Sequence, residues 1–96
     1  MGAVVDVAVN ELNGRLKGEG FDGSARFVLT DEGSILIDGA GAREGEGPAD
    51  VTLTASADTF QQILAGDLDA TSAFMTGKLA LDGDMGTAMK LAALLA

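Results

Sequence analysis

The segment 85–96 constrains the fold more than any other part of this sequence, because it is apolar almost all the way round. Thr87 and Lys90 are its clearly polar residues, whereas a helix on a protein surface has a whole polar face. Asp84 stands where a helix N-cap is expected. Apolar residues then follow helical spacing: Met85, Ala88, Met89 and Ala92. This helix must therefore cover a core, a partner chain or an apolar ligand.

The rest of the chain changes repeatedly between helical and strand patterns. Helical spacing of apolar residues predicts three further helices, at about 5–17, 58–65 and 70–76. We expect Asp58 and Asp69 to cap the second and third of them. Alternation of apolar and polar residues predicts four strands, at about 24–30, 35–37, 51–56 and 78–82.

The first two strands are close enough to form a hairpin, and the Gly-rich segment 39–48 is expected to be a mobile loop. A run of strands followed by helices favours an α+β fold, with a mostly antiparallel sheet and helices on one face. The length of 96 residues suits one domain, 1–96.

The net charge of −9 argues against several classes of partner. Nucleic-acid binding needs clustered cations, and the six Lys and Arg form no stripe, so we expect no nucleic-acid partner. Acidity also disfavours anionic membranes, so we expect at most transient membrane contact. The chain has no cysteine, and we expect a cytoplasmic protein.

Residues that carry catalysis or hold metals are scarce. The chain has no His, Cys, Tyr or Trp, which removes the usual nucleophile pairs and zinc ligands. The segment 67–71 begins like a calcium loop, but Ser72 and Lys78 occupy the positions that need Gly and Glu. We therefore expect no enzyme, no metal and no cofactor.

Methionine and phenylalanine gather near the end of the chain, at Phe74, Met75, Met85 and Met89. Methionine fills gaps in cores, and it also suits surfaces that adapt to varied ligands. Because only 4% of the residues are aromatic, large side chains that could fill an interior are scarce. These four residues therefore favour a ligand cavity, with a packed core as the alternative.

An ordered series of segments in the second half resembles the sterol carrier protein 2 family, the nonspecific lipid-transfer domains. The series runs through 50–56, 58–60, 63–66, 74–79, 83–85 and 88–91. The resemblance implies a twisted sheet of about five strands covered by helices. It also implies a hydrophobic tunnel between sheet and helices for a fatty acid, fatty acyl-coenzyme A, phospholipid or sterol.

The resemblance also implies which residues line this tunnel. On the helix side and in the last strand they would be Phe60, Leu64, Phe74, Met75, Leu79, Leu81, Met85 and Met89. On the sheet side they would be Phe27, Leu29, Ile35 and Ile37. The function implied is lipid binding or transfer. The alternative is a non-catalytic interaction module that uses the last helix for a partner or a homodimer, and we expect a monomer or homodimer.

Overall fold

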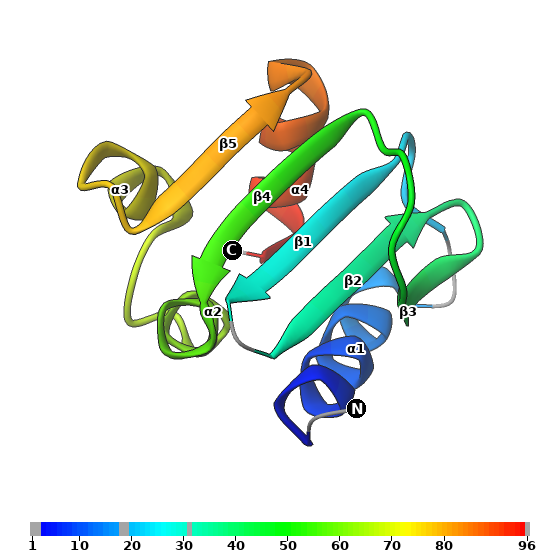
Figure 1. Cartoon of the computed structure of the whole chain (residues 1–96), viewed down its shortest axis with the longest axis horizontal. Helices are drawn as coiled ribbons and strands as arrows, with labels where there is room; N and C mark the ends of the chain where they lie inside the picture. The colour runs from blue at the N-terminus through cyan, green and yellow to red at the C-terminus, as the bar shows by residue number, and fades with distance from the viewer. Residues whose placement is uncertain (1–2, 18–19, 31, 96) are drawn as a thin grey trace.

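The computed structural model describes residues 3–17, 20–30 and 32–95, which form four helices and five strands (Figure 1). In chain order the elements are α1 (Ala3–Leu16), β1 (Ala25–Thr30), β2 (Gly33–Asp38), β3 (Gly41–Glu44), β4 (Val51–Ser56), α2 (Ala57–Ala65), α3 (Ala70–Met75), β5 (Leu79–Gly83) and α4 (Met85–Leu95).

The strands form one sheet in the order β3-β2-β1-β4-β5. β1 and β2 form the predicted antiparallel hairpin, and the β2–β3 and β4–β5 pairs are also antiparallel. β4 instead runs parallel to β1, because the chain passes through β2 and β3 before it returns beside β1. The prediction of a mostly antiparallel sheet of about five strands is confirmed.

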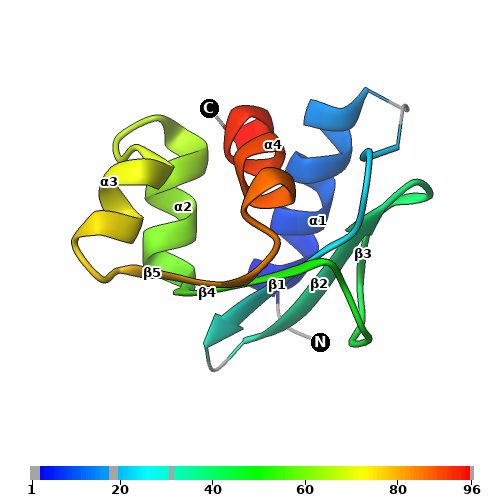
Figure 2. The same cartoon turned by 90° about the horizontal axis from the view of Figure 1, so that it is seen from above.

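All four helices lie on the same face of the sheet (Figure 2). α1 packs on β2 and β3, α2 packs on β1 and β4, and α4 lies between α1 and α2. α3 packs beside β5, at the opposite edge from α1. The predicted α+β architecture is thus confirmed. Within the described residues, none of these helices is long and apolar enough to span a bilayer.

The core lies between this helical layer and the inward face of the sheet. Strand register aligns inward side chains in rows across the strands, one of which joins Ile35, Phe27, Leu53 and Leu81. Ile35 and Phe27 are fully buried, whereas Leu81, in the edge strand β5, is only partly buried. The packing therefore becomes more open towards the β5 edge of the sheet.

The prediction that residues 39–48 form a loop is wrong for Gly41–Glu44, which form β3 and pair with β2. Gly41 has a φ of +108°, a turn conformation that glycine adopts easily. The Asn13 side chain of α1 then bonds both the N–H and the C=O of Ala42, at 2.9 Å each. A strand of four residues with one buried side chain shows no alternation of apolar and polar residues in the sequence. Contacts with distant residues such as Asn13 therefore hold β3 in place.

The predicted helix starts are mostly confirmed. Asp69 accepts a hydrogen bond from the Ser72 N–H, and Asp84 accepts one from the Thr87 N–H. The cap of α2 is Ser56 rather than Asp58, because the Ser56 side chain accepts from the Thr59 N–H. Asp58 lies within the first turn of α2, where its carboxylate accepts a hydrogen bond from the Gln62 amide.

Candidate functional site

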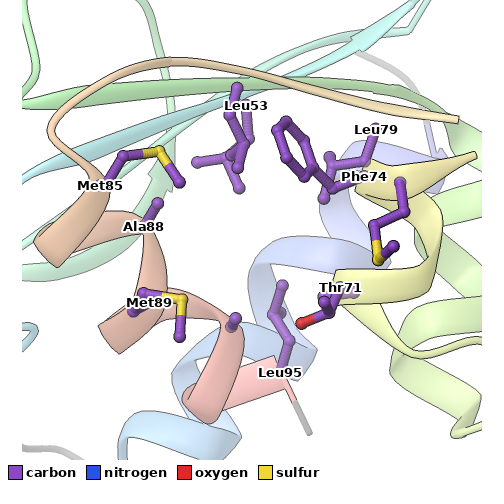
Figure 3. Close-up of a pocket in the computed structure, with 12 residues that line it drawn as sticks. Leu53, Thr71, Phe74, Leu79, Met85, Ala88, Met89 and Leu95 are labelled. Atoms are coloured by element: carbon purple, nitrogen blue, oxygen red, sulfur yellow. The ribbon is translucent and has the colours of Figure 1, made fainter. Parts of the chain in front are cut away.

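An apolar pocket of about 270 Å³ lies between α3 and α4, over the inward face of β4 and β5 (Figure 3). Its walls come from the two helices, and its floor comes from the sheet. The residues that line it are Leu53, Ala70, Thr71, Phe74, Met75, Leu79, Leu81, Met85, Ala88, Met89, Ala92 and Leu95.

The local sequence positions each wall. Alternation along β5 turns Leu79 and Leu81 towards the helices, and register places them opposite Ala55 and Leu53 of β4. Helical spacing places Met85, Ala88, Met89 and Ala92 on one side of α4. The sharp turn at Gly83, with a φ of +121°, lets the chain pass from β5 into α4 within a few residues.

The space remains open because the facing helix surfaces carry small side chains. Ala70 of α3 and Ala88 and Ala92 of α4 line the pocket, and none of them reaches far from its own helix. Phe74 enters from α3 and Leu53 rises from β4, so the larger side chains meet the space from its edges (Figure 3). A void bordered by apolar atoms forfeits dispersion contacts that a ligand restores.

The rim of the pocket exposes large apolar side chains to solvent. The exposed fractions are 79% for Met75, 63% for Met89, 51% for Met85 and 43% for Phe74. Exposed apolar residues that cluster at one place mark an interaction or ligand site rather than ordinary surface. Three of the four are methionines, whose flexible and polarisable side chains adapt to varied ligands.

Among the described residues that line the pocket, one has a polar side chain. This residue is Thr71, whose hydroxyl oxygen points into the space (Figure 3). Asp84, next to the lining residue Met85, binds the Thr87 hydroxyl at 2.6 Å and the Thr87 N–H at 2.8 Å. These hydrogen bonds lower the pKa of Asp84 below its ordinary value, so this carboxyl group is ionised at neutral pH.

Six of the twelve residues expected to line a tunnel come together at this pocket: Phe74, Met75, Leu79, Leu81, Met85 and Met89. The other six lie outside its lining: Phe27, Leu29, Ile35, Ile37, Phe60 and Leu64. All of these except the partly buried Leu64 are fully packed in the core, because α1, α2 and α4 cover the β1 and β2 part of the sheet.

Sequence reasoning missed six lining residues: Leu53, Ala70, Thr71, Ala88, Ala92 and Leu95. Helical spacing from Met85 and Met89 already pointed to Ala88 and Ala92, and strand alternation pointed to Leu53. Thr71 gave no such signal, because its position depends on how α3 docks at the β5 edge.

In the described ranges, no three acidic side chains come together as a metal site would require.

The model of the SCP-2 sterol transfer family matches residues 2–96. Sterol carrier protein 2 from Yarrowia lipolytica, solved in its apo form, superposes with a TM-score of 0.72 at 28% identity. That superposition covers 96% of this chain and 86% of the other. The fold around the pocket is therefore one that solved members of this family share.

Two characterised relatives differ in overall length. Peroxisomal multifunctional enzyme A of Dictyostelium discoideum is 40% identical over 79 residues, which cover 82% of this chain and 17% of that enzyme. A fatty acid-binding protein of Yarrowia lipolytica is 41% identical over 66 residues, which cover 69% of this chain and 46% of that protein. The chain thus spans less than half the length of these relatives.

Proposed function

Because this chain belongs to the SCP-2 sterol transfer family, we propose that it binds a lipid in the pocket between α3 and α4. The observation that carries the proposal is an unfilled space lined almost entirely by carbon and sulfur. A long apolar chain entering it would leave water, and each buried methylene contributes about 0.8 kcal/mol. Binding would be passive sequestration and would involve no chemical step.

The pocket volume limits how much of a lipid is enclosed. Small-molecule sites usually measure about 300–1,000 Å³, and this space of about 270 Å³ lies just below that range. A long acyl chain would therefore fill the pocket with one part and rest on the exposed rim of Met75, Met85 and Met89 with another. Association costs offset much of the burial energy, so we expect about micromolar affinity.

The pocket would discriminate only modestly between lipids of neighbouring chain length. An apolar wall separates ligands that differ by one methylene by only about 1–3 kcal/mol. The adaptable methionine rim weakens even that discrimination.

We propose that this chain acts as a non-catalytic binding module. The enzyme from Dictyostelium discoideum matches this chain over only 17% of the enzyme's own length. We also propose the cytoplasm as its compartment.

Native mass spectrometry of freshly isolated protein, followed by organic extraction, tests the proposed function. We expect a fraction of the protein to carry a lipid mass that disappears after extraction. The spectrum also reports subunit number, so it addresses the alternative in which the apolar rim pairs two copies. Lipid-free dimers that show no thermal shift with added fatty alcohol or fatty acid would contradict lipid binding and support an interaction module.

A further inference from the structure

The methionines are the side chains of this protein that a peroxide oxidises most readily. The sequence has four methionines and no Cys, His, Tyr or Trp. Three of the four, Met75, Met85 and Met89, line the pocket between α3 and α4, and Met1 lies outside the described residues. The oxidisable side chains of the described residues are therefore gathered at the rim of the proposed lipid site.

These three side chains are accessible to an oxidant in the folded protein. All of them are exposed, so a small peroxide reaches them without any opening of the fold. They come from both walls, with Met75 on α3, and Met85 and Met89 on α4. Figure 3 shows Met85 and Met89 beside the open space. A lipid in the pocket and an oxidant at the rim would contact the same three groups.

Oxidation would make this rim polar. Methionine sulfoxide carries a polar S=O group where methionine has an apolar sulfur. In the free protein, water would solvate the added oxygen, because the three side chains are exposed. A lipid that covers the rim would remove this water. The α4 side chains that line the pocket are alanine, leucine and methionine, which donate no hydrogen bond. An oxidised rim would therefore bind lipid more weakly, because an unpaired polar group is costly to bury.

We propose that Met75, Met85 and Met89 form a sulfoxidation site for hydroperoxides, at which oxidation releases bound lipid. The inference rests on the proposed function and adds a reversible modification that controls it. The thioether sulfur attacks the terminal peroxide oxygen, so that an S–O bond forms and the O–O bond breaks. The sulfur loses two electrons, and the proton of the transferred oxygen passes to the departing oxygen. The hydroperoxide is thereby reduced to an alcohol, or to water in the case of hydrogen peroxide.

The two walls should differ in their sensitivity to oxidation. Thr71 precedes Met75 by one turn of α3, and both residues line the pocket. The Thr71 hydroxyl can donate a hydrogen bond to a sulfoxide oxygen on Met75. Sulfoxides at Met85 and Met89 would have only apolar lining neighbours on α4. We therefore expect the α4 methionines to account for most of the loss of lipid affinity.

Treatment with hydrogen peroxide, followed by its removal, tests the inference. Peptide mass spectrometry should show one added oxygen on each rim methionine, and equilibrium dialysis should show about tenfold weaker binding of 1-dodecanol. The urea midpoint of unfolding should not change, because the oxidised side chains are exposed. The two methionine sulfoxide reductases, one for each sulfoxide epimer, should restore the affinity.

Three results would count against the inference. Oxidised rim methionines with unchanged affinity, or a loss of affinity that accompanies unfolding, would overturn it and leave the proposed function intact. Failure of the untreated protein to bind 1-dodecanol would contradict the proposed function and this inference together.

Leucine variants provide the matched control, because leucine is apolar, similar in volume to methionine and not oxidised by peroxide. The triple variant Met75→Leu, Met85→Leu and Met89→Leu retains Met1. Its affinity for 1-dodecanol, whatever the initial value, should not fall after peroxide treatment. An equal fall in this variant would assign the effect to Met1 and overturn the inference. The wild-type loss and its reversal by the reductases are decisive by themselves if the triple variant fails to fold.

A parallel treatment with cumene hydroperoxide identifies the source of the oxidant. An apolar hydroperoxide that enters the pocket is held beside the thioethers, so it should oxidise the rim methionines faster than free methionine in the same solution. Hydrogen peroxide reaches them from water and gives the reference ratio. A higher ratio for cumene hydroperoxide supports oxidation by a bound lipid peroxide, and equal ratios support oxidation from solution. Rim methionines that neither reagent oxidises would overturn the inference.

Discussion

Phe27 of β1 and Phe60 of α2 meet edge to face, with ring centroids 4.5 Å apart and planes at 64°. Both side chains are fully buried, so the sheet beneath α2 is packed solid. The space over β4 and β5, between α3 and α4, is open in contrast. We expect substitutions in the two regions to have different effects, because the first region is packed core and the second is the proposed binding site.

Phe60→Leu should destabilise the protein without changing lipid affinity. Loss of the edge-to-face pair and of ring volume should cost about 1–2 kcal/mol of the free energy of unfolding. Urea unfolding measures this cost, and equilibrium dialysis of 1-dodecanol measures affinity on the folded variant. A clear loss of affinity in a folded Phe60→Leu protein would show that the ligand reaches beneath α2.

Met85→Glu should weaken lipid binding by about tenfold or more, because it places a charge at the apolar rim. The Met85 side chain is 51% exposed, so we expect the free energy of unfolding to change by less than about 0.5 kcal/mol. The matched control is Val7→Glu, since Val7 is an apolar residue of α1 with 57% exposure and lies outside the pocket lining. Similar losses of binding in both variants would contradict a site at α4, and outright unfolding of Met85→Glu would indicate a packed core there.

We expect Arg15 to stabilise the fold, because its guanidinium group donates hydrogen bonds to carbonyl oxygens at the ends of two helices. It donates to the carbonyl of Leu64 at the end of α2 at 2.7 Å, and to those of Leu94 and Leu95 in α4 at 3.4 and 3.1 Å. Arg15→Met should lower the free energy of unfolding by about 1–3 kcal/mol. Arg15→Lys should recover only part of this loss, because one ammonium group cannot span both helix ends. Full rescue by lysine would show that charge alone matters.

The ion pair between Asp38 and Arg43, which joins the end of β2 to β3, should make the titration of Asp38 depend on Arg43. The hydrogen bonds from the Arg43 guanidinium, at 2.9 Å, and from the Ala40 N–H lower the pKa of Asp38 from 3.8 to about 2. Since the folded pKa is the lower one, the contribution of Asp38 to stability is complete above about pH 4 and is lost as pH falls towards 2. The contribution is small, because exposed pairs are screened by solvent and salt.

Carbon-13 NMR of the Asp38 carboxyl group measures this titration directly. We expect a midpoint at about 2 in the native protein and a return towards 3.8 in Arg43→Gln. A native midpoint close to 3.8 would contradict the ion pair and the anchoring of β3 that it supports.

The sequence predicted most of this fold because its strongest patterns are local. Caps at Asp69 and Asp84 and the strand alternation at 51–56 depend on neighbouring residues, and the structure confirms them. β3 escaped prediction because it is held by Asn13, far away in the sequence. Ser56 rather than Asp58 caps α2, a choice that depends on where β4 ends.

The candidate site was harder to predict than the fold. Alternation shows that Phe27, Leu29, Ile35 and Ile37 face the helices, but it cannot show which part of that face is filled. The answer depends on α1, α2 and α4 covering β1 and β2, while the short α3 leaves space over β5. The methionines were identified because their type and spacing both carry information, whereas Thr71 is defined only by the docking of α3.

The most direct test of lipid binding between α3 and α4 is NMR of protein labelled with carbon-13 at the Met ε-methyl and Ile δ1-methyl groups. On titration with 1-dodecanol, we expect saturable shifts of the Met75, Met85 and Met89 resonances, since these side chains border the pocket. The resonances of Ile35 and Ile37, which are buried in the core, should move little. Unchanged Met75, Met85 and Met89 signals at saturating lipid, or shifts confined to the isoleucines, would contradict a binding site in this pocket.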